Sequence, residues 1–340
     1  AITAATFLAL LGALGRISKN PIAYGISGFY TSFFRGTPLI VQLFLWYLAL
    51  PQLAIGLLPE PYASWFIWPA QVAGVVGIAF KFGAVPFHMW VPDVYHGAPS
   101  AVTLFVATAP KIASFALAFR LLAGGLGNIV DTWAQMLAIL AVLSALLGNV
   151  IAIAQTNLKR MLAYSAIGNV GFILLGFVAG TEQGYEAALY YTITYVIMTL
   201  GSFGVILLAG RRGFEADELD DYKGLHARDP LLALMMMMLM FSTAGIPPFV
   251  GFWAKLQIFE ALWASNHLAL VVFAAAVSVI GVFYYLRVVK LMYFDAPNAS
   301  APPTESHPGV RLALGLNALA VLVLGLFPES LLSLCEQVLG

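Results

Sequence analysis

Runs of about 20 apolar residues recur along the whole chain, and this feature constrains the fold more than any other. A helix of that length crosses the hydrocarbon core of a bilayer. Short polar segments separate the runs, so the sequence predicts an all-α, polytopic bundle of transmembrane helices. We expect about ten spans, at residues 1–15, 38–58, 65–86, 99–120, 132–154, 161–180, 186–209, 231–264, 267–290 and 309–327.

Composition agrees with a chain that lies mostly in lipid. Of its 340 residues, 61% are hydrophobic and 9% are charged, whereas about a quarter of the residues in soluble proteins are charged. The formal net charge is zero, which argues against nucleic acid as a partner. The single cysteine, Cys335, excludes an internal disulfide or a cluster of cysteine ligands in this sequence. The first residues, AITAATFLALLGALGR, lack the basic start of a signal peptide, so we expect them to begin in or next to a span.

Two of the expected spans contain breaks. The third ends in GAVPFHMWVP, with a break near 84–92, and the eighth carries AGIPPFVG, with a break near 245–251. Proline and glycine leave backbone N–H and C=O groups that lipid cannot satisfy, so such breaks occur where protein or water reaches the backbone. The sequence therefore predicts two discontinuous helices that border a cavity.

The basic residues fall on one side of the predicted bundle. Twelve of the sixteen Lys and Arg residues lie in or next to the loops around 16–37, 87–98, 155–160, 210–230 and 291–308, whereas the opposite side has Arg120. Cytoplasmic loops are enriched in Lys and Arg, so the basic side is predicted to be cytoplasmic and both termini to lie outside the cytoplasm.

Three lysines, Lys81, Lys111 and Lys255, lie within the expected spans. A lysine at the bilayer centre costs about 2.5–3.5 kcal/mol, and such residues usually line a polar pathway. Lys81 and Lys255 flank the two breaks, and each has the alternative of extending its long side chain to the headgroups. Lys111 is about twelve residues from either end of its span, too deep for that alternative. The three lysines predict a hydrated path along which protons move.

Weaker candidates surround these lysines. His88, Asp93 and His96 follow the first break and are candidates for proton uptake, although loop histidines often have structural roles. Glu260, near the outer end of its span, is a candidate for proton release or an interfacial residue. Three further residues, Tyr164, Ser165 and Asn169, form a polar stripe that serves either a proton path or hydrogen bonding between helices.

The longest loop, RRGFEADELDDYKGLHARD, carries both signs of charge and allows two interpretations. The first is a solvated connector. The second is a docking surface for a neighbouring subunit or an amphipathic segment that lies along the membrane.

Several segments resemble one protein family. They are FKFGAVPFHMWVPDVYHGAPSAVTLFVATAPKIASFALAFR, NLKRMLAYSAIGNVGF, YYTITYVIMTLGSFGVI, DELDDYKGL, FSTAGIPPFVGFWAKLQIFEAL and YYLRVVKLMYFDAP. From about residue 70 onward the chain resembles the N-type antiporter-like membrane subunit of respiratory complex I, the NADH-quinone oxidoreductase. PDVYHGAP resembles the N-type subunit more than the M-type and L-type subunits.

This resemblance implies a proton-translocating subunit of a translocase, driven by quinone reduction in other subunits. Lys81, Lys111 and Lys255 match the family's central row of lysines. The chain itself is expected to bind no cofactor and no metal, with NADH, quinone, flavin and iron–sulfur clusters bound by partner subunits. The expected partners are the lipid bilayer and other membrane subunits of complex I, and the expected location is the bacterial inner membrane.

The sequence departs from the family in three respects. The family subunit usually has about fourteen spans, built from two inverted five-helix repeats. A membrane glutamate pairs with the lysine that Lys81 matches, but the first three spans here contain no acidic residue. A histidine frequent in the family is replaced by Asn169.

The N-terminal segment has a different resemblance. RISKNPIAYGISGFYTSFFRGTPLIVQLFLWYLALPQL resembles the first spans of an amino-acid ABC transporter permease, although that family's coupling loop is missing. We therefore divide the chain into a permease-like segment, residues 1–60, and an antiporter-like proton-translocating domain, residues 61–340. An ABC permease and a stand-alone cation/proton antiporter stay open as alternative functions.

Overall fold

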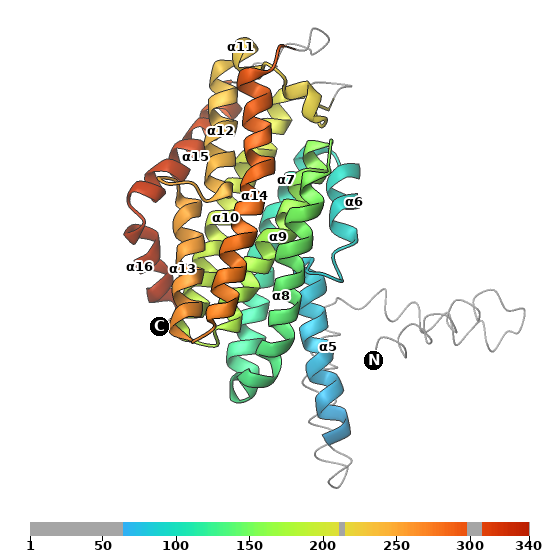
Figure 1. Ribbon diagram of the computed structural model, residues 1–340, viewed down its shortest axis with the longest axis vertical. Coiled ribbons are helices and arrows are strands. Elements are labelled where there is room, and N and C mark those ends of the chain that lie inside the picture. The colour runs from blue at the N-terminus through green and yellow to red at the C-terminus, as the bar shows by residue number, and fades with distance from the viewer. Residues whose placement is uncertain (1–63, 211–214, 298–307, 340) are drawn as a thin grey trace, which may run out of the picture. The chain divides into compact units, whose positions relative to one another are not determined.

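The computed structural model describes residues 64–210, 215–297 and 308–339 (Figure 1). Within these ranges all regular structure is helical apart from one isolated β-bridge, which confirms the all-α prediction. The chain divides into two compact units, residues 1–77 and 78–340, and the fold below is that of the second. The expected spans 1–15 and 38–58, and the permease-like segment that contains them, lie outside the described residues.

The elements follow one another in the order labelled in Figure 1. They are α5 (Ser64–Phe82), α6 (Trp90–Gly97), α7 (Ser100–Phe119), η2 (Arg120–Gly125), η3 (Gly127–Ile129), α8 (Val130–Ile153), α9 (Leu158–Val178), α10 (Glu182–Ala209), η4 (Leu219–Tyr222), α11 (Leu225–Arg228), α12 (Pro230–Ala244), α13 (Val250–Ala264), α14 (Leu268–Phe294), α15 (Pro308–Leu326) and α16 (Glu329–Leu339).

Six helical segments in the described ranges are long and apolar enough to cross a membrane. They are Ser100–Gly125, Gly127–Ile153, Leu158–Val178, Glu182–Ala209, Leu268–Phe294 and Pro308–Leu326. Each coincides with one expected span. The third expected span corresponds to α5, and the eighth is divided into α12 and α13. The prediction of a polytopic helical membrane protein is therefore confirmed.

Helix α9 lies at the centre of the second unit. It packs against α6, α8, α10 and α13, and nearly all of its side chains are buried. Glycines bring α8 and α9 close together: a Cβ on Gly148 would lie 2.4 Å from the backbone N of Gly168. Small residues allow such close packing between membrane helices. Polar side chains on α9 are consequently held inside protein and do not face lipid.

The first break separates α5 from α6. Gly83 adopts a left-handed conformation (φ 74°), and a cis peptide bond joins Val85 to Pro86. The backbone N–H of Val85 donates to Ser144 Oγ on α8 at 2.9 Å. The helical ladder is thus interrupted, but a serine hydroxyl from another helix satisfies one of the freed N–H groups.

The second break separates α12 from α13 and repeats these features. Gly245 is left-handed (φ 87°), and Pro247 and Pro248 are joined by a cis peptide bond. The backbone N–H of Gly251 donates to Ser242 Oγ at 3.1 Å. Both predicted breaks are therefore confirmed, at residues 83–89 and 245–249.

The basic loops predicted to share one side meet at one end of the second unit. Arg287 on α14 donates to the carbonyl of Ile153 at the end of α8, at 2.8 Å. Arg160 forms an ion pair with Asp93 on α6, and Arg311 on α15 forms one with Asp229 before α12. These contacts place the described basic loops at the same end of the second unit.

Candidate functional site

Lys111 is buried in the middle of α7, with 2% of the residue exposed. Its ammonium donates a hydrogen bond to the carbonyl oxygen of Phe82, the last residue of α5, at 2.5 Å. Carbonyls at a helix C-terminus have no partner within the helix and carry a partial negative charge. Lys111 therefore occupies the position at the first break where a cation is most favourable.

Lys255 makes the same kind of contact at the second break. Its side chain on α13 is buried, and the ammonium donates to the carbonyl of Ala244, the last residue of α12, at 2.7 Å. The ammonium also lies 5.5 Å from the centroid of the Phe172 ring. A carbonyl takes one of the three N–H donors of an ammonium, which leaves two further N–H donors on Lys255.

Lys81 lies in the last turn of α5 and is half-buried. The next residue, Phe82, supplies the carbonyl that Lys111 binds, so Lys81 and Lys111 lie at the same break. The carbonyl of Lys81 accepts a 3.5 Å hydrogen bond from Ser114 on α7. The structure thus brings two of the three predicted lysines together at the first break and places the third at the second break.

A buried polar cluster surrounds Asn169 on α9, and we call it the Asn169 cluster. Its four members are Ser165, Asn169, Tyr191 and Tyr285. Tyr191 donates to Asn169 Oδ1 at 2.8 Å, Asn169 Nδ2 lies 3.4 Å from the Tyr285 hydroxyl, and that hydroxyl is hydrogen-bonded to Ser165. The cluster joins α9, α10 and α14.

Sequence reasoning identified Ser165 and Asn169 but missed Tyr191 and Tyr285. The sequence feature that could have identified them is a pair of adjacent tyrosines within each of two apolar helices, at 190–191 and 284–285. Buried tyrosine hydroxyls usually have a hydrogen-bond partner, so such pairs indicate polar contacts inside the bundle. Tyr164, the third residue of the predicted stripe, is half-buried.

The remaining candidates lie nearer the surface. Asp93 and His96 are exposed on α6, and His88 is half-buried in the first break. Glu260 is exposed and accepts a 3.1 Å hydrogen bond from Gln257. It also lines an open groove of about 400 Å³. In the described part of the chain no group of three His, Cys, Asp or Glu residues is arranged to hold a metal.

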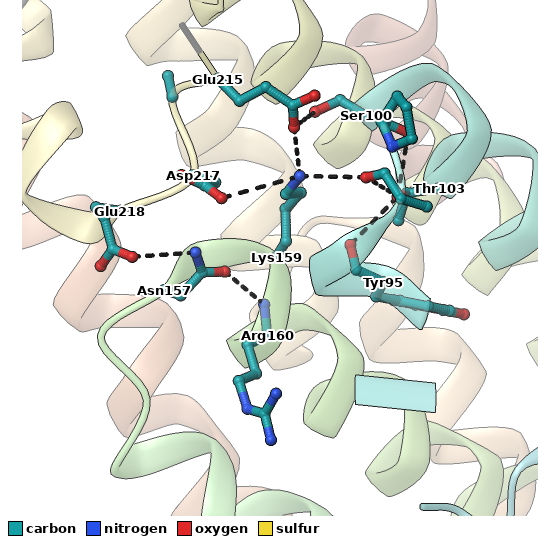
Figure 2. A network of polar contacts seen from close by, with 12 residues as sticks. Tyr95, Ser100, Thr103, Asn157, Lys159, Arg160, Glu215, Asp217 and Glu218 are labelled. Atoms are coloured by element: carbon teal, nitrogen blue, oxygen red, sulfur yellow. Dashed lines mark hydrogen bonds and ion pairs between the residues drawn. The ribbon is translucent and has the colours of Figure 1, made fainter. Parts of the chain in front are cut away.

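A second cluster, at the basic end, surrounds Lys159 (Figure 2). We call it the Lys159 clamp. The Lys159 side chain is 2% exposed and forms ion pairs with Glu215 and, at 3.9 Å, with Asp217. It also donates to the carbonyl of Ala98 at 3.3 Å, and Ser100 donates to Glu215 at 3.2 Å. The clamp ties the start of α9 to the α6–α7 junction and to the loop after α10.

This arrangement corrects the interpretation of the longest loop as a simple solvated connector. Leu219 N–H donates to the carbonyl of Thr156 at 2.8 Å, and an isolated bridge pairs Asn157 with Glu218. Tyr222 is buried, and its hydroxyl donates to Ala216 at 2.8 Å. From Glu215 onward the loop is therefore anchored on the bundle, because backbone and ionic contacts hold it there.

The Lys159→Met variant is expected to release this loop from α9. It removes three contacts of one buried ammonium and leaves two carboxylates without their partner, so we expect a loss of about 1–3 kcal/mol in the free energy of unfolding. The checks are thermal unfolding and limited proteolysis near residue 215. Lys223→Met, which removes an exposed ion pair with Asp220, is the matched control and should cost less than about 1 kcal/mol. Equal effects of the two variants would contradict the clamp.

The clamp has a defined pH dependence. Burial of the Glu215 carboxyl raises its pKa, but hydrogen bonds and charge from Lys159, with help from Ser100, outweigh burial and hold the pKa below the usual 4.5. A lowered pKa in the folded state stabilises the protein at pH values above the unfolded pKa, and this contribution is lost as the pH falls through the folded pKa. The clamp is therefore formed at neutral pH and is lost in acid.

Long apolar helices, two breaks and a buried lysine bound at each break define a multi-pass membrane protein with discontinuous helices. The chain belongs to the NADH:quinone oxidoreductase/Mrp antiporter family of transmembrane proteins, whose family model matches residues 2–281. This match begins at residue 2 and so includes the segment predicted to be permease-like.

Eight curated relatives carry the same name, NADH-quinone oxidoreductase subunit N, which confirms the N-type resemblance. The chain is 49% identical to the protein of Alkalilimnicola ehrlichii over 327 residues, covering 96% of this chain and 64% of the relative. It is 57% identical to that of Thiobacillus denitrificans over 268 residues, covering 78% of this chain and 55% of the relative. The chain thus spans little more than half to just under two thirds of the length of these proteins.

Solved structures share the fold. A chain of respiratory complex I from Thermus thermophilus with bound aureothin is 30% identical, with a TM-score of 0.72, and the match covers 95% of this chain and 71% of that one. A chain of the Mrp complex from Dietzia sp. is 21% identical with a TM-score of 0.74, and it supports the fold alone.

Proposed function

We propose that the chain is part of the N-type membrane subunit of a bacterial NADH-quinone oxidoreductase and that it translocates protons. The names of its curated relatives support the assignment to this complex. Lys81, Lys111 and Lys255 are the residues that would carry the protons, and quinone reduction in other subunits would supply the energy.

One observation carries the proposal. Lys111 and Lys255 are both buried in the bundle, and each donates to the last carbonyl of a broken helix. A purely structural helix needs neither the break nor the charge, and both are unfavourable in lipid. Their repeated combination favours a site where protons are held and passed on.

The pair at the first break provides a transfer step. Lys81 lies in the last turn of α5 and Lys111 donates to the last carbonyl of that helix, so two like charges share the first break. A proton that arrives on one amine therefore favours release from the other, so protonation at one end of the pair is coupled to deprotonation at the other. Movement of the proton leaves the number of N–H bonds in the pair unchanged.

The same proposal states which subunits and cofactors would surround the chain and how the chain would be oriented in the membrane. NADH, flavin, iron–sulfur clusters and quinone would be bound by other subunits, which would contact this chain within the bacterial inner membrane. The basic end of the bundle would face the cytoplasm, because Lys and Arg gather there. Both termini would then lie on the opposite side.

Lys111→Ala tests the function. In the assembled complex, reconstituted in vesicles, the variant is expected to abolish proton pumping, because the amine that accepts the proton at the first break is gone. NADH-driven electron transfer by the detached input arm should be unchanged. The measurement is the number of protons moved for each NADH oxidised, with sodium omitted to separate this function from a cation/proton antiporter.

Lys290→Ala is the control for this test, because Lys290 is exposed and forms an ion pair with Asp295 at the basic end. It should pump at the wild-type ratio. Normal pumping by a stably assembled Lys111→Ala complex would refute the proposed function.

A further inference from the structure

The chain folds back on the end of α5 before it enters the first break. The backbone N–H of Gly83 donates to the carbonyl of Phe80 at 3.0 Å. The N–H of Ala84 donates to the carbonyl of Ala79 at 2.8 Å. With glycine in the left-handed conformation, these two bonds form the Schellman motif that ends many helices. The motif leaves the last two carbonyls of the helix, at residues 81–82, free to accept from Ser114 and the lysine of α7.

Val85 carries the next backbone N–H, and its hydrogen-bond partner comes from another helix. The N–H donates to Ser144 Oγ on α8 at 2.9 Å, and the two residues are 5% and 0% exposed. Ser144 donates its own proton to the carbonyl of Leu140 at 2.6 Å, so its oxygen is oriented to accept. A buried N–H without a partner is costly. The serine hydroxyl therefore fixes the chain three residues beyond Phe82.

Ser144 lies on a closely packed pair of helices, α8 and α9. A Cβ on Gly171 of α9 would lie 2.6 Å from the backbone N of Ala145, the residue after Ser144. One turn further along α8, Gly148 approaches the backbone of α9 just as closely. Because backbones meet at both places, neither helix can shift without the other. Helix α8 is consequently a rigid support for the Ser144 hydroxyl.

The contact made by Lys111 depends on the direction of the Phe82 carbonyl. The ammonium donates to that oxygen at 2.5 Å, and both residues are buried. Hydrogen bonds weaken steeply when their geometry is distorted. Gly83, between Phe82 and the anchored Val85, has the greatest backbone freedom of any residue type. Without the anchor at Val85, the backbone at Gly83 can turn the carbonyl away from Lys111.

The second break has the same helix end but a different anchor. The N–H of Gly245 donates to the Ser242 carbonyl at 2.9 Å. The N–H of Ile246 donates to the Phe241 carbonyl at 3.0 Å, and a lysine again binds the last carbonyl of the helix. The hydroxyl that accepts a freed N–H there belongs to Ser242, within the broken helix itself. At the first break the corresponding hydroxyl comes from α8, so this break depends on a neighbouring helix.

We propose that Ser144 is a positioning residue for proton transfer at the first break. By accepting the Val85 N–H, its hydroxyl holds the Phe82 carbonyl in front of Lys111. This inference rests on the proposed function. Ser144 acts through the backbone and transfers no proton, because its own proton stays in the bond to Leu140.

Ser144→Ala tests this role, because it removes the hydroxyl and keeps a strong helix former in α8. In the assembled complex, reconstituted in vesicles, we expect the number of protons moved for each NADH oxidised to fall several-fold. The amount of assembled complex and NADH oxidation by the detached input arm should stay at the wild-type level. Ser144→Thr keeps a hydroxyl on the same carbon and should restore most of the pumping. A merely structural role would lower assembly together with pumping.

Ser202→Ala is the matched control. Ser202 on α10 is 3% exposed, and its hydroxyl donates to the carbonyl of Met198 in its own helix at 2.9 Å. Among the described residues, that hydroxyl makes no hydrogen bond to a break. The control variant therefore loses the same group from an equally buried position and should pump at the wild-type ratio.

A structure of the Ser144→Ala complex gives a readout that does not depend on pumping. We expect the distance between Lys111 Nζ and the Phe82 carbonyl oxygen to exceed hydrogen-bond range, whereas Ser202→Ala should keep the contact. An unchanged contact in Ser144→Ala, or pumping equal to that of Ser202→Ala, would overturn the proposal.

Lys111→Ala measured in parallel separates this proposal from the proposed function. If Lys111→Ala stops pumping while Ser144→Ala does not, the positioning role of Ser144 is refuted and the proposed function stands. If a stably assembled Lys111→Ala complex pumps normally, the proposed function is refuted, and the role of Ser144 in proton transfer is refuted with it.

Discussion

Replacement of Lys255 by methionine is expected to abolish proton pumping by the assembled complex. Methionine keeps the unbranched shape of the side chain but has no proton to give, and the carbonyl of Ala244 loses its donor. Lys255 is the amine that the structure places at the second break, and the proposed proton path through this half of the bundle depends on it. The measurement is proton pumping for each NADH oxidised, as for Lys111.

Lys255→Arg separates a role in proton transfer from a role in binding the end of α12. Arginine keeps the positive charge and can donate to the Ala244 carbonyl, but it does not release its proton in proteins. We therefore expect Lys255→Arg to retain stability and to lose pumping. Restored pumping in this variant would show that Lys255 acts as a fixed charge and that the proton moves elsewhere.

Gly251→Ala is expected to cause the largest loss of stability among single substitutions of the glycines described above. A Cβ at this position would lie 1.9 Å from the carbonyl oxygen of Ser242 and 2.7 Å from its carbonyl carbon, and both are backbone atoms. Neither can rotate away, so α12 and α13 would have to separate. We expect the free energy of unfolding to fall by about 3 kcal/mol, measured by thermal or denaturant unfolding of the assembled complex.

Gly309→Ala is the control for this substitution. Gly309 lies in the first turn of α15, and a Cβ there would meet no atom within 4 Å. Alanine is favoured over glycine in helices by up to about 1 kcal/mol, so this variant should be neutral or slightly more stable. A Gly251→Ala protein as stable as Gly309→Ala would mean that the two half-helices do not pack as closely as described.

The long helices were predictable from the sequence because a span of lipid demands a fixed length of apolar residues. The two breaks were predictable because Gly83, Pro86, Gly245 and Pro248 interrupt that pattern. The short helices α6 and α16 could not be predicted in this way, and both are amphipathic. Helix α6 lies in a segment that was predicted as a loop, and α16 lies in residues after the last expected span, which were left unassigned. Their apolar residues are too few to stand out against a chain that is apolar throughout.

The candidate site was predictable to a different degree. Lys111 and Lys255 could be identified because a charged residue within an apolar span is costly and usually lines a polar pathway. Their partners are the backbone carbonyls of Phe82 and Ala244, and no side-chain pattern encodes a carbonyl. Lys159 was counted as one more basic residue of the cytoplasmic side, because its burial depends on Glu215, 56 residues away. Contacts between distant segments have no signature in a single sequence.

The breaks have a bearing on which ions the bundle tolerates. Ser144 and Ser242 each cover a freed backbone N–H, whereas the carbonyls of Phe82 and Ala244 remain turned toward an ammonium. Oxygen dipoles at these two places stabilise positive charge and repel negative charge. Each break therefore provides a favourable place for one cation, and the ammonium of the lysine that donates to the carbonyl is that cation.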